Sequence, residues 1–221
     1  MDKSEKLFPV TQVGSWPRSR VLLKALRDKQ KDRITPEEFD QIANKEAERC
    51  IQYQLDADVD ILVEGEHHRD NFYSFLTDKL HGTKLMSLAD MLDTLENKES
   101  FEEMLDTLDV PASSIKNPTC IGKLSRKKSL TLDEFKFVKS LTDKPVKITL
   151  PGPYLLTRAM WVSSFSKQGY NSKVEMADDI VAILREELPD LEAAGCEFVQ
   201  FDEPVLTEIV MSEDCDRRTF M

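Results

Sequence analysis

The sequence predicts an α/β fold built from parallel βα units. Four short segments have the apolar composition of strands, and segments with helical character separate them. Strands that alternate with helices in this way form parallel sheets with right-handed crossovers. The four segments also end in polar or conformationally special residues, namely GSWP, EGEHHRD, PGPY and DEP. Because the carboxyl ends of parallel strands share one edge, we expect these four termini to lie together.

The first part of the chain predicts a strand, two helices and a second strand. Residues 9–15 form the first strand, which closes at the turn GSWP, and a helix is expected over residues 18–29. Thr35 has the features of a helix N-cap, since Pro36 follows it at the first helical position and two glutamates favour the helix dipole. This second helix leads into the second strand, residues 60–66.

The middle of the chain predicts an insertion. Residues 86–109 have helical propensity and contain MLDTL twice, which indicates two short helices. The segment TCIGKLS, residues 119–125, has strand-like composition and predicts a hairpin. The basic cluster there is expected to be solvated; it comprises Lys123, Arg126, Lys127 and Lys128. We therefore predict a single domain, residues 1–221, with a helical and hairpin insertion at about 83–130.

The last part of the chain predicts two more βα units. The expected elements, in order, are a helix over residues 132–141, a strand over 146–150, helices over 154–166 and 173–194, and a strand over 198–201. Gly195 stops the last helix. The final strand has the composition of a buried one and leads directly into the acidic pair of DEP.

Composition limits the class of protein. The chain has 221 residues, of which 40% are hydrophobic and 32% charged, as in a globular protein. Its formal charge of −11 argues against nucleic acid and anionic lipid as partners, since both need clustered positive charge. Its apolar runs are too short for a membrane span and its N-terminus lacks a secretory core, which predicts a cytoplasmic location. The four cysteines show no CxxC spacing and are expected to be reduced thiols.

The acidic pair after the fourth strand has two interpretations. Asp202 and Glu203 form either a solvated turn before a helix that begins at Pro204, or one wall of an active site. The expected clustering of four special strand ends favours the active site. Adjacent side chains on an extended segment face opposite ways, so only one of the two carboxylates can face such a site.

Other candidate residues follow the remaining strands. Ser15 is either a helix N-cap or part of a turn whose backbone N–H groups bind an anion. Glu64, Glu66, His67 and His68 have side chains that suit a metal ion, but adjacent histidines on an extended segment point apart, so the histidines are expected to be loop residues. Glu66 and Asp202, on neighbouring strand ends, would anchor an ammonium group. Trp161 either stacks on a planar ligand or lies in the core.

The motifs VGSWP, LVEGEHHRDNFYSF, ITLPGPY and FVQFDEP, in this order, resemble the catalytic barrel of the cobalamin-independent methionine synthase family. The resemblance implies a (β/α)8 TIM barrel and zinc-dependent transfer of a methyl group to a small thiol such as homocysteine, with a donor that can be a folate. By position it assigns Ser15, Glu66 and Asp202 to the amino-acid thiol, with Glu66 and Asp202 on its ammonium. It leaves Glu203 mainly structural.

Two departures from the family pattern widen the functional hypothesis. The family's folate-stacking Trp aligns with Ala159, and Trp161 follows two positions later. Alkyl transfer to another thiol such as coenzyme M, or a non-catalytic amino-acid-binding or assembly module, therefore remains an alternative. The family's zinc ligands follow the DEP strand in a His-x-Cys setting that Cys215 lacks. Zinc is thus expected for the family, while no metal ligand is assigned in this chain.

The resemblance also implies that the chain covers roughly the first half of the barrel. Four strands are predicted, and only 17 residues follow Pro204 in the 221-residue sequence. An open half-barrel exposes strand edges and apolar faces, which favour association. We therefore expect a homo-oligomer, or completion of the barrel by a second chain.

Overall fold

The computed structural model describes residues 7–87, 90 and 116–207; the ranges 1–6, 88–89, 91–115 and 208–221 lie outside it. The chain forms two compact units. The first falls within Met1–Lys79, Lys127–Leu150 and Arg185–Gln200, and the second within Leu80–Arg126, Pro151–Leu184 and Phe201–Met221. No helix in the described part of the chain is long and apolar enough to cross a membrane.

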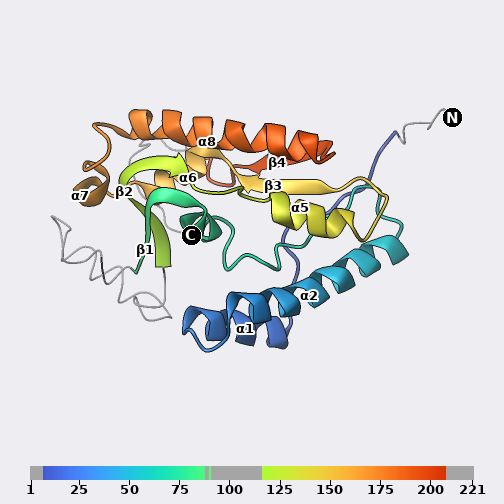
Figure 1. Cartoon of the computed structure of the whole chain (residues 1–221). Coiled ribbons are helices and arrows are strands. Elements are labelled where there is room, and N and C mark those ends of the chain that lie inside the picture. The colour runs from blue at the N-terminus through green and yellow to red at the C-terminus, as the bar shows by residue number, and fades with distance from the viewer. Residues whose placement is uncertain (1–6, 88–89, 91–115, 208–221) are drawn as a thin grey trace. The chain divides into compact units, whose positions relative to one another are not determined.

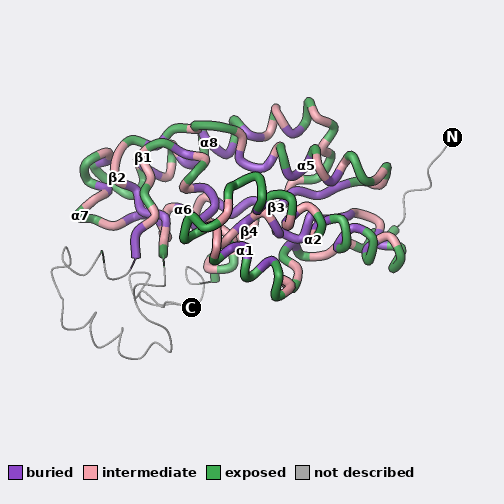
Figure 2. The backbone as a smooth tube through the Cα atoms, turned by 60° about the horizontal axis from the view of Figure 1, so that its bottom comes forward, coloured by how far each residue is buried: buried purple, intermediate pink, exposed green. Residues whose placement is uncertain are grey.

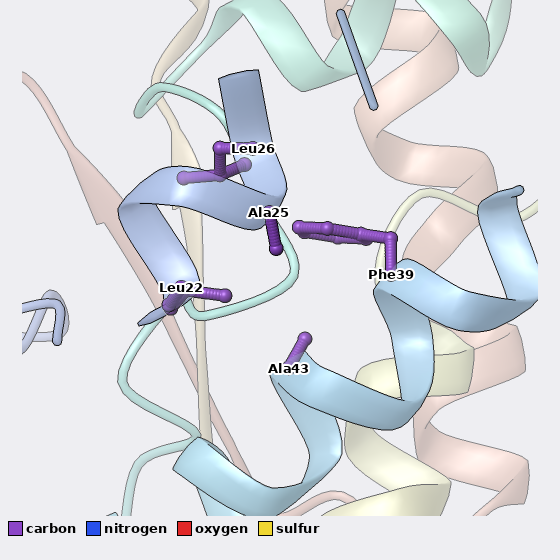
Figure 3. Close-up of a cluster of buried hydrophobic side chains, with 5 residues drawn as sticks. All are labelled: Leu22, Ala25, Leu26, Phe39 and Ala43. Carbon is purple, nitrogen blue, oxygen red and sulfur yellow. The ribbon is translucent and has the colours of Figure 1, made fainter. Parts of the chain in front are cut away.

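The first unit contains the two N-terminal helices that the sequence predicts. They are α1 (Arg20–Gln30) and α2 (Pro36–Asp56), and they lie side by side (Figure 1). A cluster of buried side chains joins them, as Figure 3 shows: Leu22, Ala25 and Leu26 on α1 meet Phe39 and Ala43 on α2. Apolar residues at helical spacing on both helices therefore produce one shared core.

The N-terminus of α2 has the capping geometry expected from its sequence. The Glu38 backbone N–H donates to Thr35 Oγ1 at 3.2 Å, and the Thr35 N–H donates to Glu38 Oε2 at 2.8 Å. This reciprocal pair is a capping box, and it confirms Thr35 as the cap. Buried positions then recur every three or four residues along α2, with exposed positions between them, and the pattern can be followed in Figure 2.

The predicted strands lie in the sheet in the order of the chain. Thr11 pairs with Ile61 and Leu62 pairs with Val146, both in parallel orientation. The regular strands are β3 (Lys147–Pro151) and β4 (Phe198–Asp202), which pair with each other. The α/β fold with parallel neighbours is confirmed, and the sheet does not close on itself within the described ranges.

The first two strands are much shorter than predicted, because side chains replace the backbone ladder. Residues 9–15 and 60–66 contribute only isolated bridges. Gln54 satisfies the backbone of Val63 through two hydrogen bonds, 3.0 and 2.8 Å long. Gln200 Nε2 likewise donates to the Val13 carbonyl at 3.0 Å. Backbone groups bonded to side chains in this way do not extend a strand pairing.

The fourth strand is not buried as its composition predicts. Phe198 is 44% exposed and Phe201 is 41% exposed. β4 has one strand neighbour, β3, among the described residues, so its other edge has no paired strand there. Apolar composition alone cannot tell a central strand from such an edge strand.

The second unit contains an antiparallel hairpin. Its strands are β1 (Leu80–Ser87) and β2 (Lys116–Arg126), which pair from Leu80 with Arg126 to Ser87 with Lys116. The predicted strand over 119–125 is confirmed within β2. Met86 and Ser87 end β1 and are not helical, which corrects the start of the segment predicted to be helical. The rest of that segment, apart from Asp90, lies outside the described residues.

The chain after β3 forms α6 (Pro153–Met160), α7 (Ser163–Ser166) and α8 (Lys173–Ala193). The single helix predicted over 154–166 is interrupted, because Trp161 and Val162 have extended backbone conformations. The Val162 N–H instead donates to Ser166 Oγ at 3.0 Å. Gly195 follows α8 with a φ of 89°, a left-handed conformation that suits glycine and confirms the predicted helix stop.

A buried carboxylate in the first unit holds the start of α5 (Leu132–Lys139), the helix predicted over 132–141. Glu187 is fully buried, and its two oxygens accept hydrogen bonds from the backbone N–H groups of Leu130 and Thr131 at 2.8 and 2.7 Å. The Ser129 and Thr131 hydroxyls add further bonds. A negative charge at a helix N-terminus also complements the helix dipole.

We predict that Glu187→Gln lowers the free energy of unfolding by about 1.5–3 kcal/mol, the range for hydrogen bonds to a charged group. Gln keeps the shape but places an NH2 group against backbone donors. Urea denaturation followed by circular dichroism measures the change. Glu192→Gln is the control, since Glu192 is exposed on α8, the helix that also holds Glu187, and it should alter stability by less than about 0.5 kcal/mol. Equal effects of the two variants would contradict the capping role.

Candidate functional site

The segment after the second strand forms a tight turn instead of remaining extended. Gly65 and Glu66 have φ values of 91° and 59°. A positive φ is uncommon for a residue with a side chain, and such strain is often found at functional sites. The Arg18 guanidinium supports the turn, since it donates to the carbonyls of Glu66 and Arg69 at 3.3 and 3.0 Å. The turn directs the Glu66 side chain into the first unit.

The Glu66 carboxylate is buried and held by two side chains. The residue is 5% exposed. Its Oε1 accepts a hydrogen bond from Thr149 Oγ1 at 3.0 Å, and Arg69 Nη1 lies 3.7 Å from the same oxygen. Burial raises the pKa of Glu66, and the Arg69 charge and the Thr149 hydrogen bond oppose that rise.

Arg69 is the most connected side chain of this site. It is 2% exposed, and its Nε and Nη2 donate to Glu134 on α5 at 3.0 and 2.7 Å. Its Nη2 also donates to the Thr149 carbonyl at 2.9 Å, and its guanidinium lies 4.6 Å from the centre of the Phe75 ring. A guanidinium can be buried at this depth because nearly all its donors are satisfied.

The glycine of GSWP makes room for this arrangement. A Cβ atom on Gly14 would lie 2.8 Å from Glu66 Oε1 and 3.0 Å from Thr149 Cγ2. The Trp16 N–H donates to the Gly65 carbonyl at 3.0 Å, which ties the first motif to the second. Residues from the motifs GSWP, EGEHHRD and ITLPGPY therefore meet, as the shared edge of a parallel sheet predicts.

A small cavity lies among these residues. Its volume is about 10 Å³, which holds about one water molecule. The lining comprises Gly14, Val63, Glu64, Gly65, Glu66, Arg69, Glu134, Lys147, Ile148 and Thr149. The side chains around Glu66 thus form a charged cluster and not a chamber of amino-acid size.

The two histidines lie in the turn, as loop residues, and not on an extended strand. His68 Nδ1 lies 2.7 Å from Glu64 Oε1, and its Nε2 lies 2.8 Å from Asn44 Oδ1. Burial disfavours the charged form of both partners, but their mutual hydrogen bond prevails: the pKa of Glu64 is lowered and that of His68 is raised. Burial lowers the pKa of His67, whose ring nitrogens have no hydrogen-bond partner among the described residues.

Ser15 lies beside this cluster in the chain but is exposed. It does not cap α1, which corrects one of its two interpretations. Ser19 is the N-cap: its Oγ accepts from the Leu22 N–H at 3.1 Å and donates to Glu46 Oε1 at 2.9 Å. The anion-binding interpretation of the turn at Ser15 stays a prediction.

The remaining candidates belong to the second unit. Glu203 accepts hydrogen bonds from the Tyr154 and Leu155 N–H groups of α6 at 2.6 and 2.8 Å. Any side chain on Gly152 would overlap the Glu203 carboxylate. Glu203 therefore has the structural contacts that its predicted role requires.

Asp202 and Trp161 are also in the second unit. Asp202 is half-buried, and its carbonyl accepts from the Gly152 N–H at 2.8 Å. Trp161 is 7% exposed, with its indole N–H donating to Ser163 Oγ at 3.2 Å, a placement that suits the core alternative. Glu66 is in the first unit, so a shared ammonium site with Asp202 stays a prediction, as does ligand binding by Trp161.

Zinc has no ligand set in the described part of the chain. No three His, Cys, Asp or Glu side chains there are arranged to hold a metal ion. Cys215 lies outside the described residues. The described residues therefore do not form a zinc site.

Comparison with known proteins decides the family. Residues 8–221 match the family described as cobalamin-independent synthase, catalytic domain. The chain belongs to this family. The resemblance found in the four motifs is confirmed, and it extends over nearly the whole sequence.

Individual relatives agree with the family. The chain is 29% identical over 215 residues to 5-methyltetrahydropteroyltriglutamate–homocysteine methyltransferase of Saccharomyces cerevisiae, with 97% of the chain and 25% of the relative aligned. The chain thus spans about a quarter of that enzyme's length.

Solved structures share the fold. One is a B12-independent methionine synthase from Shewanella sp. W3-18-1 in complex with selenomethionine, with a TM-score of 0.63, 24% identity, and 89% of this chain and 51% of that chain covered. Another, from Listeria monocytogenes and named as a vitamin-B12-independent methionine synthase, gives a TM-score of 0.65, 18% identity, and 94% and 55% coverage. At these identities the likeness concerns the α/β fold.

Sequence reasoning missed two residues of this site. Arg69 and Glu134 are 65 positions apart, and neither position alone indicates a pair. The available signal was Arg69 itself, the next-to-last residue of EGEHHRD and three positions after Glu66, because a buried acidic cluster needs a counter-charge.

We predict that His68 stabilises the fold most at mildly acidic pH. Its pKa is raised above the ordinary 6.5, so its contribution is present below that value and is lost as pH rises through the folded-state pKa. Glu64, with a pKa lowered from 4.5, loses its contribution only as pH falls through its folded-state pKa. The stability difference between wild type and His68→Gln should therefore be largest near pH 5–6, on the order of 1–3 kcal/mol, and shrink above it.

Urea unfolding at a series of pH values measures this difference, in which the titrations of groups that do not interact with His68 cancel. His81→Gln is the control, since His81 is exposed on the hairpin. A difference for His68→Gln that grows from pH 6 to pH 9 would contradict the assignment.

Proposed function

We propose that this chain supplies the amino-acid-binding part of a cytoplasmic methyltransferase that transfers a methyl group to a small thiol such as homocysteine. One observation carries the proposal: Gly14 and Thr149 both lie against the buried carboxylate of Glu66, and the three residues come from three different motifs of the family. A carboxylate is the side-chain group that pairs best with an ammonium ligand.

The names of the relatives support the substrate class. The yeast relative is named for homocysteine as acceptor and for a methyltetrahydropteroyl donor, which is a folate. The Shewanella structure holds selenomethionine, an amino acid with a methyl group on selenium. We infer an amino-acid thiol as acceptor and a folate as donor for this chain as well.

We assign Glu66 and Asp202 to the substrate ammonium, and Ser15 to the amino-acid carboxylate through the backbone N–H groups of its turn. Trp161 is the aromatic candidate for the donor. Each assignment follows the family motifs. Glu203 stays outside the site, because two backbone N–H groups already occupy its oxygens.

Zinc dependence is proposed on the resemblance alone. The described residues offer no ligand set for the ion, so its ligands would lie outside them. No step proposed for Ser15, Glu66 or Asp202 runs through the metal.

We also propose that the chain forms a partial (β/α) barrel, with the segment at about 83–130 as an insertion, and that it is completed by a second copy or another chain. The exposed phenylalanines of β4 support this, because apolar side chains on an open strand edge favour strand addition.

Self-association is expected for the purified chain. Light scattering should give a mass above the 25.4 kDa of one chain. Phe198→Lys places a charge on the exposed strand and should reduce the mass toward that of a monomer. Val174→Lys is the control, since Val174 is 71% exposed on α8. A wild-type protein that stays monomeric at high concentration would rule out the self-association.

Amino-acid binding tests the proposed function. In the assembled enzyme, Asp202→Asn keeps the shape but removes the charge, and should weaken binding of L-homocysteine by roughly 1.5–3 kcal/mol. Glu203→Gln should lower stability more than affinity, because it disturbs the N-terminus of α6. Isothermal titration and thermal unfolding measure the two effects. Equal affinity of wild type and Asp202→Asn would contradict the assignment of Asp202.

A further inference from the structure

We propose that Thr149 and Arg69 are positioning residues for Glu66: they hold its Oε1 and leave its Oε2 to accept a hydrogen bond from the substrate ammonium. The inference rests on the proposed function, and it adds residues outside the predicted site. It also states which oxygen of Glu66 faces the ligand.

The contacts of Glu66 all fall on one oxygen. Thr149 Oγ1 lies 3.0 Å and Arg69 Nη1 lies 3.7 Å from Oε1. Oε2 has no hydrogen-bond partner among the described residues. A carboxylate anchored in this way has one fixed oxygen and one oxygen with accepting capacity to spare.

The direction of the Thr149 hydrogen bond follows from its neighbours. Arg69 Nη1 donates to Thr149 Oγ1 at 3.3 Å. A guanidinium can only donate, so the hydroxyl accepts there and its single hydrogen is available for Glu66. Arg69 thus donates to Thr149, and Thr149 donates to Glu66. A hydrogen bond donated to Glu66 favours its ionised form.

Arg69 lies near Glu66 but makes its closest ion pair with another carboxylate. Its short contacts go to Glu134, at 2.7 Å from Nη2, compared with 3.7 Å to Glu66. Glu64, Glu134 and Lys147 also line the cavity next to Glu66, so three carboxylates and two basic side chains meet there. Because Glu134 takes the closest contact with Arg69, Arg69 does not form a close ion pair with Glu66, and the Glu66 carboxyl group stays open to an incoming cation.

Gly14 is consistent with the same arrangement. A side chain at this position would approach Glu66 Oε1 and the Thr149 methyl group within 3.0 Å. The contact between Thr149 and Glu66 therefore depends on a bare backbone at Gly14, in the first motif of the family.

Thr149→Val tests the proposal because it removes the hydroxyl and nearly preserves the shape. Thr149→Ser keeps the hydroxyl and should behave as wild type. Thr11→Val is the control, since Thr11 Oγ1 makes a comparable 2.8 Å hydrogen bond to the Ile61 carbonyl in the same sheet but does not touch Glu66. If Thr149→Val does not fold, as judged by circular dichroism, Thr149→Ala removes the same hydroxyl.

Two measurements are made on each protein. Carbon-13 NMR of labelled glutamate follows the titration of Glu66 without ligand, with Glu66→Gln identifying its signal. Isothermal titration gives the Kd for L-methionine. In Thr149→Val we expect the Glu66 titration to move to higher pH and the Kd to rise about 3–10-fold, the effect of one hydrogen bond. Neither should change in Thr11→Val.

The outcomes separate the two proposals. If wild type binds L-methionine and Thr149→Val titrates and binds in the same way as wild type, the positioning role is wrong and the proposed function stands. If the assembled wild-type enzyme binds neither L-methionine nor L-homocysteine, the proposed function is wrong. In that case a shifted Glu66 titration in Thr149→Val would still establish the control of Glu66 by Thr149.

Discussion

The first unit depends on one buried guanidinium. Arg69 joins three segments that are distant in the sequence, because it bonds to Glu134 on α5 and to Thr149 on β3 from the turn after the second strand. Burial of a charge is unfavourable unless partners satisfy its donors, so each of these segments must be in place for the others to be stable. The position of Glu66, three residues before Arg69, follows from this constraint.

The carboxylates of the protein fall into two kinds according to what fills their oxygens. Glu187 and Glu203 each accept bonds from two backbone N–H groups at the start of a helix, in the first and the second unit respectively. Such carboxylates have little accepting capacity left, which suits a structural role. Glu66 instead has one hydroxyl donor and a more distant guanidinium. A buried carboxylate whose oxygens are only partly hydrogen-bonded within the protein can still accept a hydrogen bond from a ligand.

Local features of the fold were predictable because short-range interactions decide them. Thr35 followed by Pro36 begins a helix through contacts within four residues, and Gly195 ends one through its own backbone freedom. The break at Trp161 was not predicted, although the hydrogen bond that accompanies it, from the Val162 N–H to Ser166 Oγ, spans only four positions. The shortened second strand depends on Gln54, which bonds to the backbone of Val63 from another element.

The sequence by itself determined the α/β class, the order of helices and strands, the family motifs and the carboxylates that could bind an ammonium group. All of these depend on residue type and on spacing along the chain. Only the tertiary structure decided that Glu66 has a left-handed backbone, that Thr149 and Arg69 hold it, and that Glu134 takes the closest contact with Arg69. Those partners lie up to 83 positions apart, and a hydrogen bond between them exists only after folding brings their strands and helices together.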